Sequence, residues 1–120
     1  MSQKEQRFVS DHGQSVDQEL LDQMVQRTVR AVRPRRIILF GSAVNGTMGP
    51  NSDLDLLVVM PDGTHRRRTA QAIYRSLVGV GFAKDVIVVT ETDLREHAQN
   101  PSLVLFSALK YGRELYRAPQ

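Results

Sequence analysis

Residues 36–60 read RIILFGSAVNGTMGPNSDLDLLVVM, and this stretch decides the fold that we expect for the chain. It opens with a short apolar run, residues 36–40, which is rich in Ile and Leu, stops at Gly41 and predicts a buried strand. Residues 41–52 are rich in Gly, Asn, Ser and Pro, which predicts a loop. A second apolar run, residues 53–60, predicts another strand. The segment therefore indicates two strands joined by a polar loop.

The second predicted strand begins with two acidic residues at alternate positions, Asp53 and Asp55. Side chains two residues apart in a strand point to the same face of the sheet, so these carboxylates are expected to stand side by side. Adjacent carboxylates repel each other unless a cation compensates their charge. Mg²⁺ prefers such hard oxygen ligands and binds through one or two carboxylates plus substrate phosphates. The spacing therefore predicts a metal site.

The glycine-serine pair at the end of the first predicted strand is a candidate phosphate site. Gly41 has no Cβ, so a phosphate can approach its backbone closely. The Ser42 hydroxyl and nearby amides can donate hydrogen bonds to phosphate oxygens, and a helix starting there would add a favourable dipole. Gly46 allows the following loop to bend away. Gly41 and Ser42 are thus the candidate nucleotide-binding residues.

A third acidic residue, Asp85, directly precedes the apolar run of residues 86–89, which predicts a third strand over residues 85–89. If this strand lies beside the second one, Asp85 can reach the cations bound by the other two aspartates. It would then complete the metal site and accept the proton of an attacking hydroxyl as a general base.

The rest of the chain predicts helices. A capping box at Ser15–Gln18 and helical spacing of apolar residues predict a helix over residues 16–32, ended by Pro34. Thr64 is the expected cap of a helix over residues 64–77, with inward-facing Ala70, Ile73, Tyr74 and Leu77.

Two further helices are expected towards the end of the sequence. Residues 92–97 predict a short one, and Asn100-Pro101 starts another that ends near residue 111 at Gly112, a predicted left-handed cap. Leu115 and Tyr116 would add an extended piece. The expected fold class is α/β (α+β), a small mixed β-sheet with helices packed against it.

The composition fits one globular domain of 120 residues. We expect a flexible tail at residues 1–14 and a folded domain at residues 15–120. The absence of cysteine excludes a disulfide framework, a thiolate zinc site and a cysteine nucleophile, and fits a cytoplasmic protein. No apolar run approaches the ~18 residues of a membrane span. The net charge of +3 favours anionic ligands but is too small to argue for nucleic-acid binding.

Together, Phe40-Gly41-Ser42, Gly46, Ser52-Asp53-Leu54-Asp55-Leu56 and the later Asp85 resemble the DNA polymerase β nucleotidyltransferase superfamily. Within it the chain is similar to the minimal nucleotidyltransferases that serve as antitoxins of HEPN-domain toxins. The resemblance extends from about residue 32 to residue 116, including the closing segment Lys110-Tyr111-Gly112-Arg113-Glu114-Leu115-Tyr116.

This resemblance implies two Mg²⁺ ions bound by Asp53, Asp55 and Asp85, and a triphosphate bound at Gly41 and Ser42. It implies transfer of a nucleoside monophosphate, AMP from ATP, to a hydroxyl on a HEPN-domain toxin partner. The chain departs from many relatives because residues 43–46 contain no Lys or Arg. Arg35, Arg36 or the run of residues 66–68 are the candidate replacements.

Two other functions stay open from the sequence. One is a catalytically inactive binding module that neutralises a partner by contact, which the missing loop cation favours. The other is a small-molecule nucleotidyltransferase of the aminoglycoside type, which would need a second copy of the chain to complete its acceptor pocket. A homodimer therefore also stays open.

Overall fold

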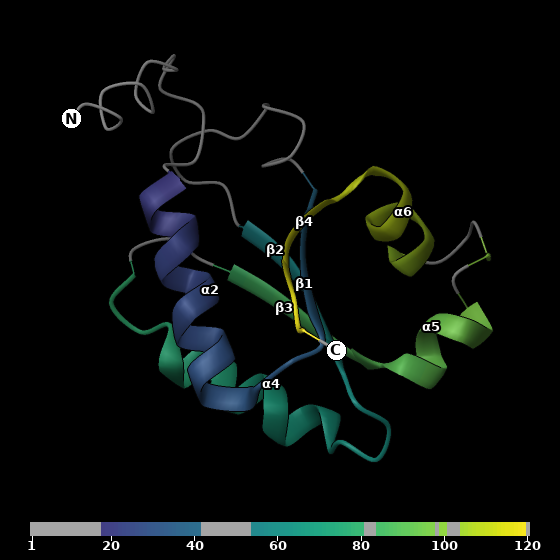
Figure 1. The fold of residues 1–120 in the computed structure, drawn as a ribbon, viewed down its shortest axis with the longest axis horizontal. Coiled ribbons are helices and arrows are strands. Elements are labelled where there is room, and N and C mark those ends of the chain that lie inside the picture. Colours follow the sequence, from purple (N-terminus) through teal and green to yellow (C-terminus); the bar gives the residue numbers. More distant parts are fainter. Residues whose placement is uncertain (1–17, 42–53, 81–83, 98, 101–103, 120) are drawn as a thin grey trace.

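The computed structural model describes residues 18–41, 54–80, 84–97, 99–100 and 104–119. Its elements follow each other along the chain (Figure 1) as α2 (Gln18–Val32), β1 (Arg36–Phe40), β2 (Leu54–Met60), α4 (Arg66–Ser76), β3 (Lys84–Thr90), α5 (Glu91–His97), α6 (Val104–Tyr111) and β4 (Arg113–Arg117). The three expected strands and four expected helices are present, and the predicted extended piece is β4. The capping box at Ser15, the tail and the first residues of the last predicted helix lie outside the described residues.

The strands form one four-stranded mixed sheet in the order β3-β2-β1-β4. β1 is antiparallel to both β2 and β4, whereas β2 and β3 are parallel. The parallel pair needs a crossover between its strands, and α4 supplies it. The mixed sheet with packed helices confirms the predicted fold class.

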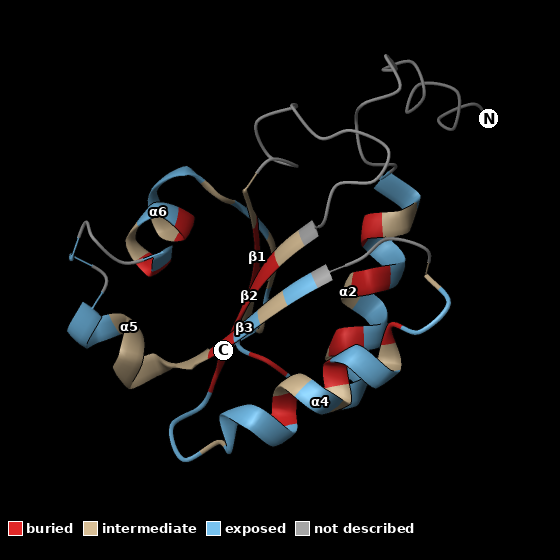
Figure 2. Cartoon of the chain, turned by 180° about the vertical axis from the view of Figure 1, so that it is seen from behind, coloured by how far each residue is buried: buried red, intermediate tan, exposed pale blue. Residues whose placement is uncertain are grey.

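Helices cover both faces of the sheet (Figure 2). On one face α2 and α4 pack against a core that includes Met24, Leu56, Val58 and Ile73, all of which are at most 1% exposed. On the other face α6 and α5 cover a smaller core made by Ile38, Leu57, Leu105 and Ala108, with Phe40 and Leu94 at its border. Alternate residues of β1 and β2 enter the two cores, as a strand with both faces covered requires.

The first turn of α4 differs from the sequence prediction. Its N-cap is His65, whose Nδ1 accepts a hydrogen bond from the backbone N–H of Arg68. The Thr64 hydroxyl instead donates to the carbonyl of Pro61 at 2.7 Å and closes the preceding turn. The prediction that Thr64 caps this helix was therefore wrong by one residue, because Thr64 is needed by the turn.

Tyr74 was predicted to face inward, and this was wrong. Its side chain is 43% exposed, and its hydroxyl accepts a hydrogen bond from the backbone N–H of Val86 at 2.9 Å. β3 is an edge strand, so its outer N–H groups lack a neighbouring strand. Tyr74 thus satisfies one of them instead of packing in the core.

Gly112 is not the left-handed cap that the sequence predicted. The positive-φ glycines of the described residues are Gly41, Gly63 and Gly79. The N–H of Gly112 donates to the carbonyl of Ala108 at 2.9 Å and prolongs the α6 hydrogen-bond pattern. A Cβ at Gly112 would meet that carbonyl, and would lie 2.9 Å from the carbonyl oxygen of Leu39. Glycine is required here by the close approach of α6 to β1.

Candidate active site

Two of the three predicted catalytic aspartates lie on neighbouring parallel strands. Asp55 on β2 and Asp85 on β3 are register partners. Register partners in a parallel pair point to the same face, and neighbouring strands lie about 4.8 Å apart. The sheet therefore brings the backbones that carry these two carboxylates side by side, at the N-terminal end of both strands.

The face that carries the two aspartates is the one on which α6 and α5 pack. Asp55 alternates with Leu57, which belongs to the core beneath α6. Asp55 is half-buried and Asp85 is exposed, and Ile87, two residues further along β3, is 37% exposed. Among the described elements, α5 and α6 therefore leave Asp85 and Ile87 on the β3 side of this face exposed.

Gly41 lies against the Asp55 carboxyl group. It follows the register partner of Asp55, Phe40, and has a left-handed φ of 83°. A Cβ at this position would collide with Oδ2 of Asp55. Two independent requirements thus select glycine: the backbone conformation and the space that the carboxylate occupies.

The other predicted members of the site lie outside the described residues. These are Ser42 and Asp53, together with Gly46 in the loop. Within the described part of the chain no group of three or more acidic, His or Cys side chains is placed to hold a metal ion. The described residues thus include two of the three predicted aspartates, Asp55 and Asp85. The third, Asp53, directly precedes Leu54, the first residue of β2.

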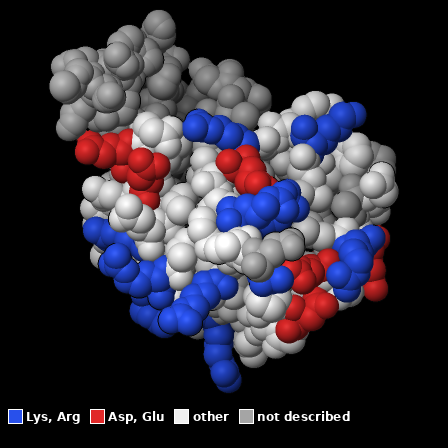
Figure 3. Space-filling model, in the orientation of Figure 1, with Lys and Arg blue, Asp and Glu red and all other residues white. Residues whose placement is uncertain are grey.

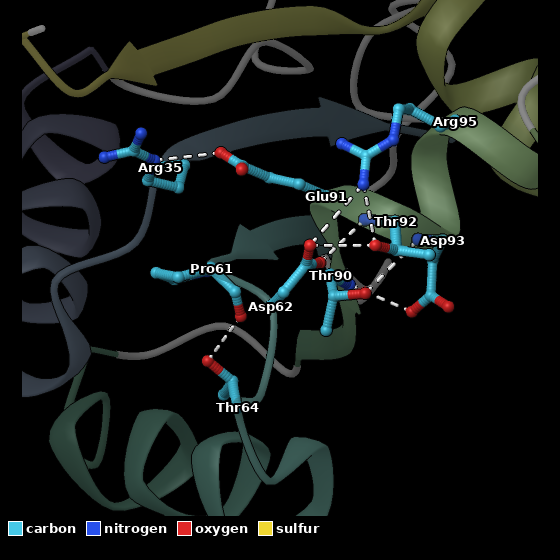
Figure 4. Close-up of polar contacts among 9 residues, drawn as sticks. All are labelled: Arg35, Pro61, Asp62, Thr64, Thr90, Glu91, Thr92, Asp93 and Arg95. Atoms are coloured by element: carbon cyan, nitrogen blue, oxygen red, sulfur yellow. Dashed lines mark hydrogen bonds and ion pairs between the residues drawn. The ribbon is translucent and has the colours of Figure 1, made fainter.

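The arginines considered as replacement cations do not lie at this end of the sheet. Arg36 is the register partner of Val59, four positions along β2 from Asp55, which corresponds to about 13 Å of strand. Arg36 pairs with Glu114, and Arg35 pairs with Glu91, each at 2.9 Å. Figure 4 shows the second pair at the far end of the strands. Both arginines are wrong candidates for a triphosphate at Gly41.

Arg66 belongs to that far end as well. Its guanidinium pairs with Asp93 at 2.9 Å, and Asp93 also accepts from the backbone N–H of Thr90. In turn, the Thr90 hydroxyl accepts a hydrogen bond from the backbone N–H of Asp93. This reciprocal pair caps α5 at its N-terminus (Figure 4).

The carboxyl groups of Asp62, Asp93 and Glu114 have lowered pKa values, and each of them makes structural contacts. The pKa of Asp93 is lowered, chiefly by its hydrogen bond from the Thr90 backbone. The pKa of Asp62 is lowered by hydrogen bonds from the backbone and hydroxyl of Thr92, with Arg95 adding a smaller effect (Figure 4). Perturbed carboxylates mark functional sites only when they line an accessible cleft, and these two stabilise the start of a helix instead.

Sequence reasoning did not consider two basic residues whose backbones lie at this end of the sheet, Lys110 and Arg113, the second of which is the register partner of Leu39. The last turn of α6 contains Lys110, and the next glycine, Gly112, packs against Leu39, close to Gly41 along β1. The Lys110 ammonium lies 5.6 Å from the ring centre of Phe106 and 5.4 Å from that of Tyr111. The sequence shows the helix, but the contact of its end with β1 appears only in the tertiary structure.

The sheet and its acidic residues define the class of this domain. The sheet is mixed, paired carboxylates stand at the start of two parallel strands, and a glycine directly follows the neighbouring antiparallel strand. The model of the nucleotidyltransferase domain family matches residues 19–115, which is most of the chain. The chain therefore belongs to the nucleotidyltransferase domain family. Membership supports a nucleotidyl transfer activity in general, and domains of this family generally use a nucleoside triphosphate and a divalent metal.

A solved structure shows the same fold. A protein of Sulfolobus solfataricus assigned as a nucleotidyltransferase superposes with a TM-score of 0.57 at 18% sequence identity. The match covers 82% of this chain and 78% of that protein. None of the curated proteins compared with this chain matches it. Among the described residues, no helix qualifies as a transmembrane segment.

Proposed function

We propose that this chain is a Mg²⁺-dependent nucleotidyltransferase that transfers AMP from ATP to a hydroxyl group on a HEPN-domain toxin, and so acts as its antitoxin. The observation that supports catalysis best is the register pairing of Asp55 with Asp85 beside Gly41. The choice of ATP and of a toxin as acceptor rests on the resemblance of the sequence to minimal nucleotidyltransferases.

The residues at this end of the sheet fit a magnesium site. Carboxylate oxygens are the protein ligands that Mg²⁺ prefers, and Asp55 and Asp85 supply them from one face. The missing side chain at Gly41 leaves the room that the Asp55 carboxylate occupies. Asp53, Asp55 and Asp85 would hold the ions. Bound Mg²⁺ would neutralise charge on the phosphates and favour ionisation of the attacking hydroxyl.

The protein residues have separate tasks in this scheme. Gly41 and Ser42 bind the triphosphate through backbone and hydroxyl hydrogen bonds. The acceptor oxygen attacks the α-phosphorus, forming one phosphorus–oxygen bond, while the bond from that phosphorus to the β-phosphate bridging oxygen breaks and pyrophosphate leaves. The carboxylate of Asp85 takes the proton of the acceptor hydroxyl. Positioning and charge compensation therefore provide most of the catalysis.

The test is a labelling reaction with the HEPN-domain protein copurified from the native host, Mg²⁺ and ATP labelled on the α-phosphate. Wild-type protein is expected to transfer label to the partner, and Asp85→Asn is expected to lower the rate roughly 10²–10⁴-fold. Asp22→Asn, a matched change at an exposed position of α2, is the control that keeps the rate. Mass spectrometry identifies the modified hydroxyl.

A second function, neutralisation by contact without catalysis, has one structural observation in its favour. Arg35, Arg36 and Arg66 form ion pairs at the far end of the strands, so they do not replace the absent loop cation. The labelling experiment separates the two functions. A stable complex in which the partner never acquires label, at any ATP concentration tested, would establish the binding module and end the enzymatic proposal.

A further inference from the structure

A groove lies between α2 and β4, on the side of the sheet away from the aspartates. Its volume is about 770 Å³, in the range of functional binding pockets. Apolar side chains form much of its lining, including Val25 and Val29 of α2 and Tyr116 of β4. These three residues pack on the core beneath α2 and α4, whereas Asp55 stands on the opposite face. The groove is therefore separate from the candidate active site.

One wall of the groove is an edge strand. β4 pairs with β1 and is the last strand of the sheet, so among the described residues no strand covers its outer side. The backbone N–H of Ala118 donates to the carbonyl of Arg35. This bond prolongs the pairing with β1 and does not involve the outer N–H and C=O groups of β4. An exposed edge with a neighbouring pocket is the arrangement by which folded domains bind extended segments through strand addition.

Positive charge borders the groove. Arg30, Arg33 and Arg35 belong to its lining, and in the described part of the chain the side chains of Arg30 and Arg33 have no ion-pair or hydrogen-bond partner. In Figure 3, drawn in the orientation of Figure 1, blue side chains gather over the lower part of α2. β4 adds exposed Arg113 and Arg117 at its two ends, where Arg113 donates to the side chain of Gln18 and Arg117 pairs with Glu114. The charge of this surface is complementary to an acidic partner.

The backbone conformation of Arg33 also favours a binding role for this positively charged surface. It follows the last residue of α2 with a left-handed φ of 53°, and its N–H donates to the carbonyl of Val29 at 3.0 Å. Helix ends of this kind are usually occupied by glycine, and another residue costs roughly 1 kcal/mol. The chain thus places a long cationic side chain on the groove at a position where glycine would be less strained.

We propose that the groove and the outer edge of β4 bind an extended acidic segment of a partner protein, which adds a fifth strand to the sheet. Its apolar side chains would fill the space over Val25, Val29 and Tyr116, and its carboxylates would pair with Arg30 and Arg33. A nucleic acid would leave the apolar lining uncovered. A second copy paired through β4 would place arginines opposite arginines. This inference does not depend on the proposed catalysis.

The test titrates a capped eight-residue peptide with the sequence VTETVTET, whose Val and Glu side chains lie on the same face of an extended strand, into the ¹⁵N-labelled full-length chain. Amide shifts are expected for β4 and for the groove side of α2, and not for β3. The same peptide with Lys in place of Glu, and one with N-methyl groups on alternate amides, are each expected to bind at least tenfold more weakly. Equal binding of either control peptide overturns the proposal.

Charge-reversal variants locate the site. Arg30→Glu with Arg33→Glu is expected to weaken binding at least tenfold, whereas the matched control, Arg67→Glu with Arg68→Glu on α4, leaves it unchanged. Circular dichroism melting checks that both fold. Gln26→Glu, an exposed change in the groove lining, is the second variant and is expected to weaken binding severalfold.

The other occupants are outcomes of the same experiment. Displacement of the peptide by a 12-nucleotide oligodeoxythymidine, with the same sensitivity to Arg30→Glu and Arg33→Glu, would assign the surface to nucleic acid. A dimer in sedimentation equilibrium that the same variants dissociate would assign it to a second copy. Either result, or no shift at millimolar peptide, overturns the proposal.

Discussion

The carboxyl group of Asp55 occupies the space where a side chain at Gly41 would begin. This contact joins the end of β1 to the start of β2 across one register position. It links the glycine, which the sequence suggested for phosphate binding, directly to a candidate metal ligand. Any residue that enlarges position 41 must therefore move the Asp55 carboxylate.

Replacing Gly41 by alanine should damage both stability and activity. The left-handed backbone costs a non-glycine residue about 1–2 kcal/mol, and the collision with Asp55 adds to this. Gly63→Ala is the matched control, because Gly63 has a φ of 90° and open space around it. Thermal unfolding should show a larger loss for Gly41→Ala, with nucleotidyl transfer lost only in that variant. Equal losses would mean that the Asp55 contact has no importance.

Mg²⁺ should stabilise the wild-type protein through the paired aspartates. At ten times its dissociation constant, an ion that binds only the folded state adds about 1.4 kcal/mol of stability. Asp85→Asn should remove most of this gain, and should make the metal-free protein slightly more stable because one of two neighbouring negative charges is gone. Melting curves with and without Mg²⁺ measure both effects. A full magnesium response in Asp85→Asn would exclude this residue as a ligand.

Replacing Gly112 by alanine should destabilise the fold by roughly 1–3 kcal/mol, because the new methyl group meets backbone carbonyl oxygens that cannot move independently. Gly112→Asn distinguishes this cause from a left-handed cap, which asparagine tolerates. We expect asparagine to be at least as harmful as alanine. Chemical denaturation gives the free energies, and Gly79→Ala, which has open space but a left-handed φ of 88°, measures the cost of a left-handed backbone without a collision. A neutral Gly112→Asn would restore the cap interpretation.

The stability of the protein should decrease in acid. Hydrogen bonds from the Thr90 backbone lower the pKa of Asp93, and a hydrogen bond from Arg117 is the largest cause that lowers the pKa of Glu114. A lowered pKa in the folded state stabilises the protein above the ordinary carboxyl pKa, and this stability is lost as the pH falls through the folded-state pKa. The free energy of unfolding should therefore fall below about pH 5.

Asp93→Asn should flatten that acid dependence, because the variant has no carboxylate to protonate at this position. Asp22→Asn is the control for the loss of one exposed acid elsewhere on the surface. Denaturant unfolding at pH 7 and pH 3 measures the difference for each protein. An unchanged slope in Asp93→Asn would show that the hydrogen bonds of Asp93 with Thr90 and Arg66 do not contribute to acid stability.

Local pattern was enough to locate most elements. The apolar run before Gly41 predicted β1 with the bounds that the structure gives, because glycine ends the run and Pro34 precedes it. Local pattern was not enough to locate the helix ends, because a polar residue there can form hydrogen bonds with several alternative partners. Thr64 bonds to Pro61 and leaves the cap of α4 to His65, and Gly112 is selected by the neighbouring strand.

The sequence by itself predicted that Asp53 and Asp55 share a face, because alternation along one strand is a local property of the backbone. The structure places Asp55 on β2, and Asp53 lies outside the described residues. The sequence could not determine which strand would lie beside them. The tertiary structure decided that β3 runs parallel to β2 with Asp85 level with Asp55, because the partner of a strand reached through a crossover helix is not fixed by local pattern. It also placed Arg35 and Arg36 at the far end of the sheet, because antiparallel pairing puts the start of β1 opposite the end of β2.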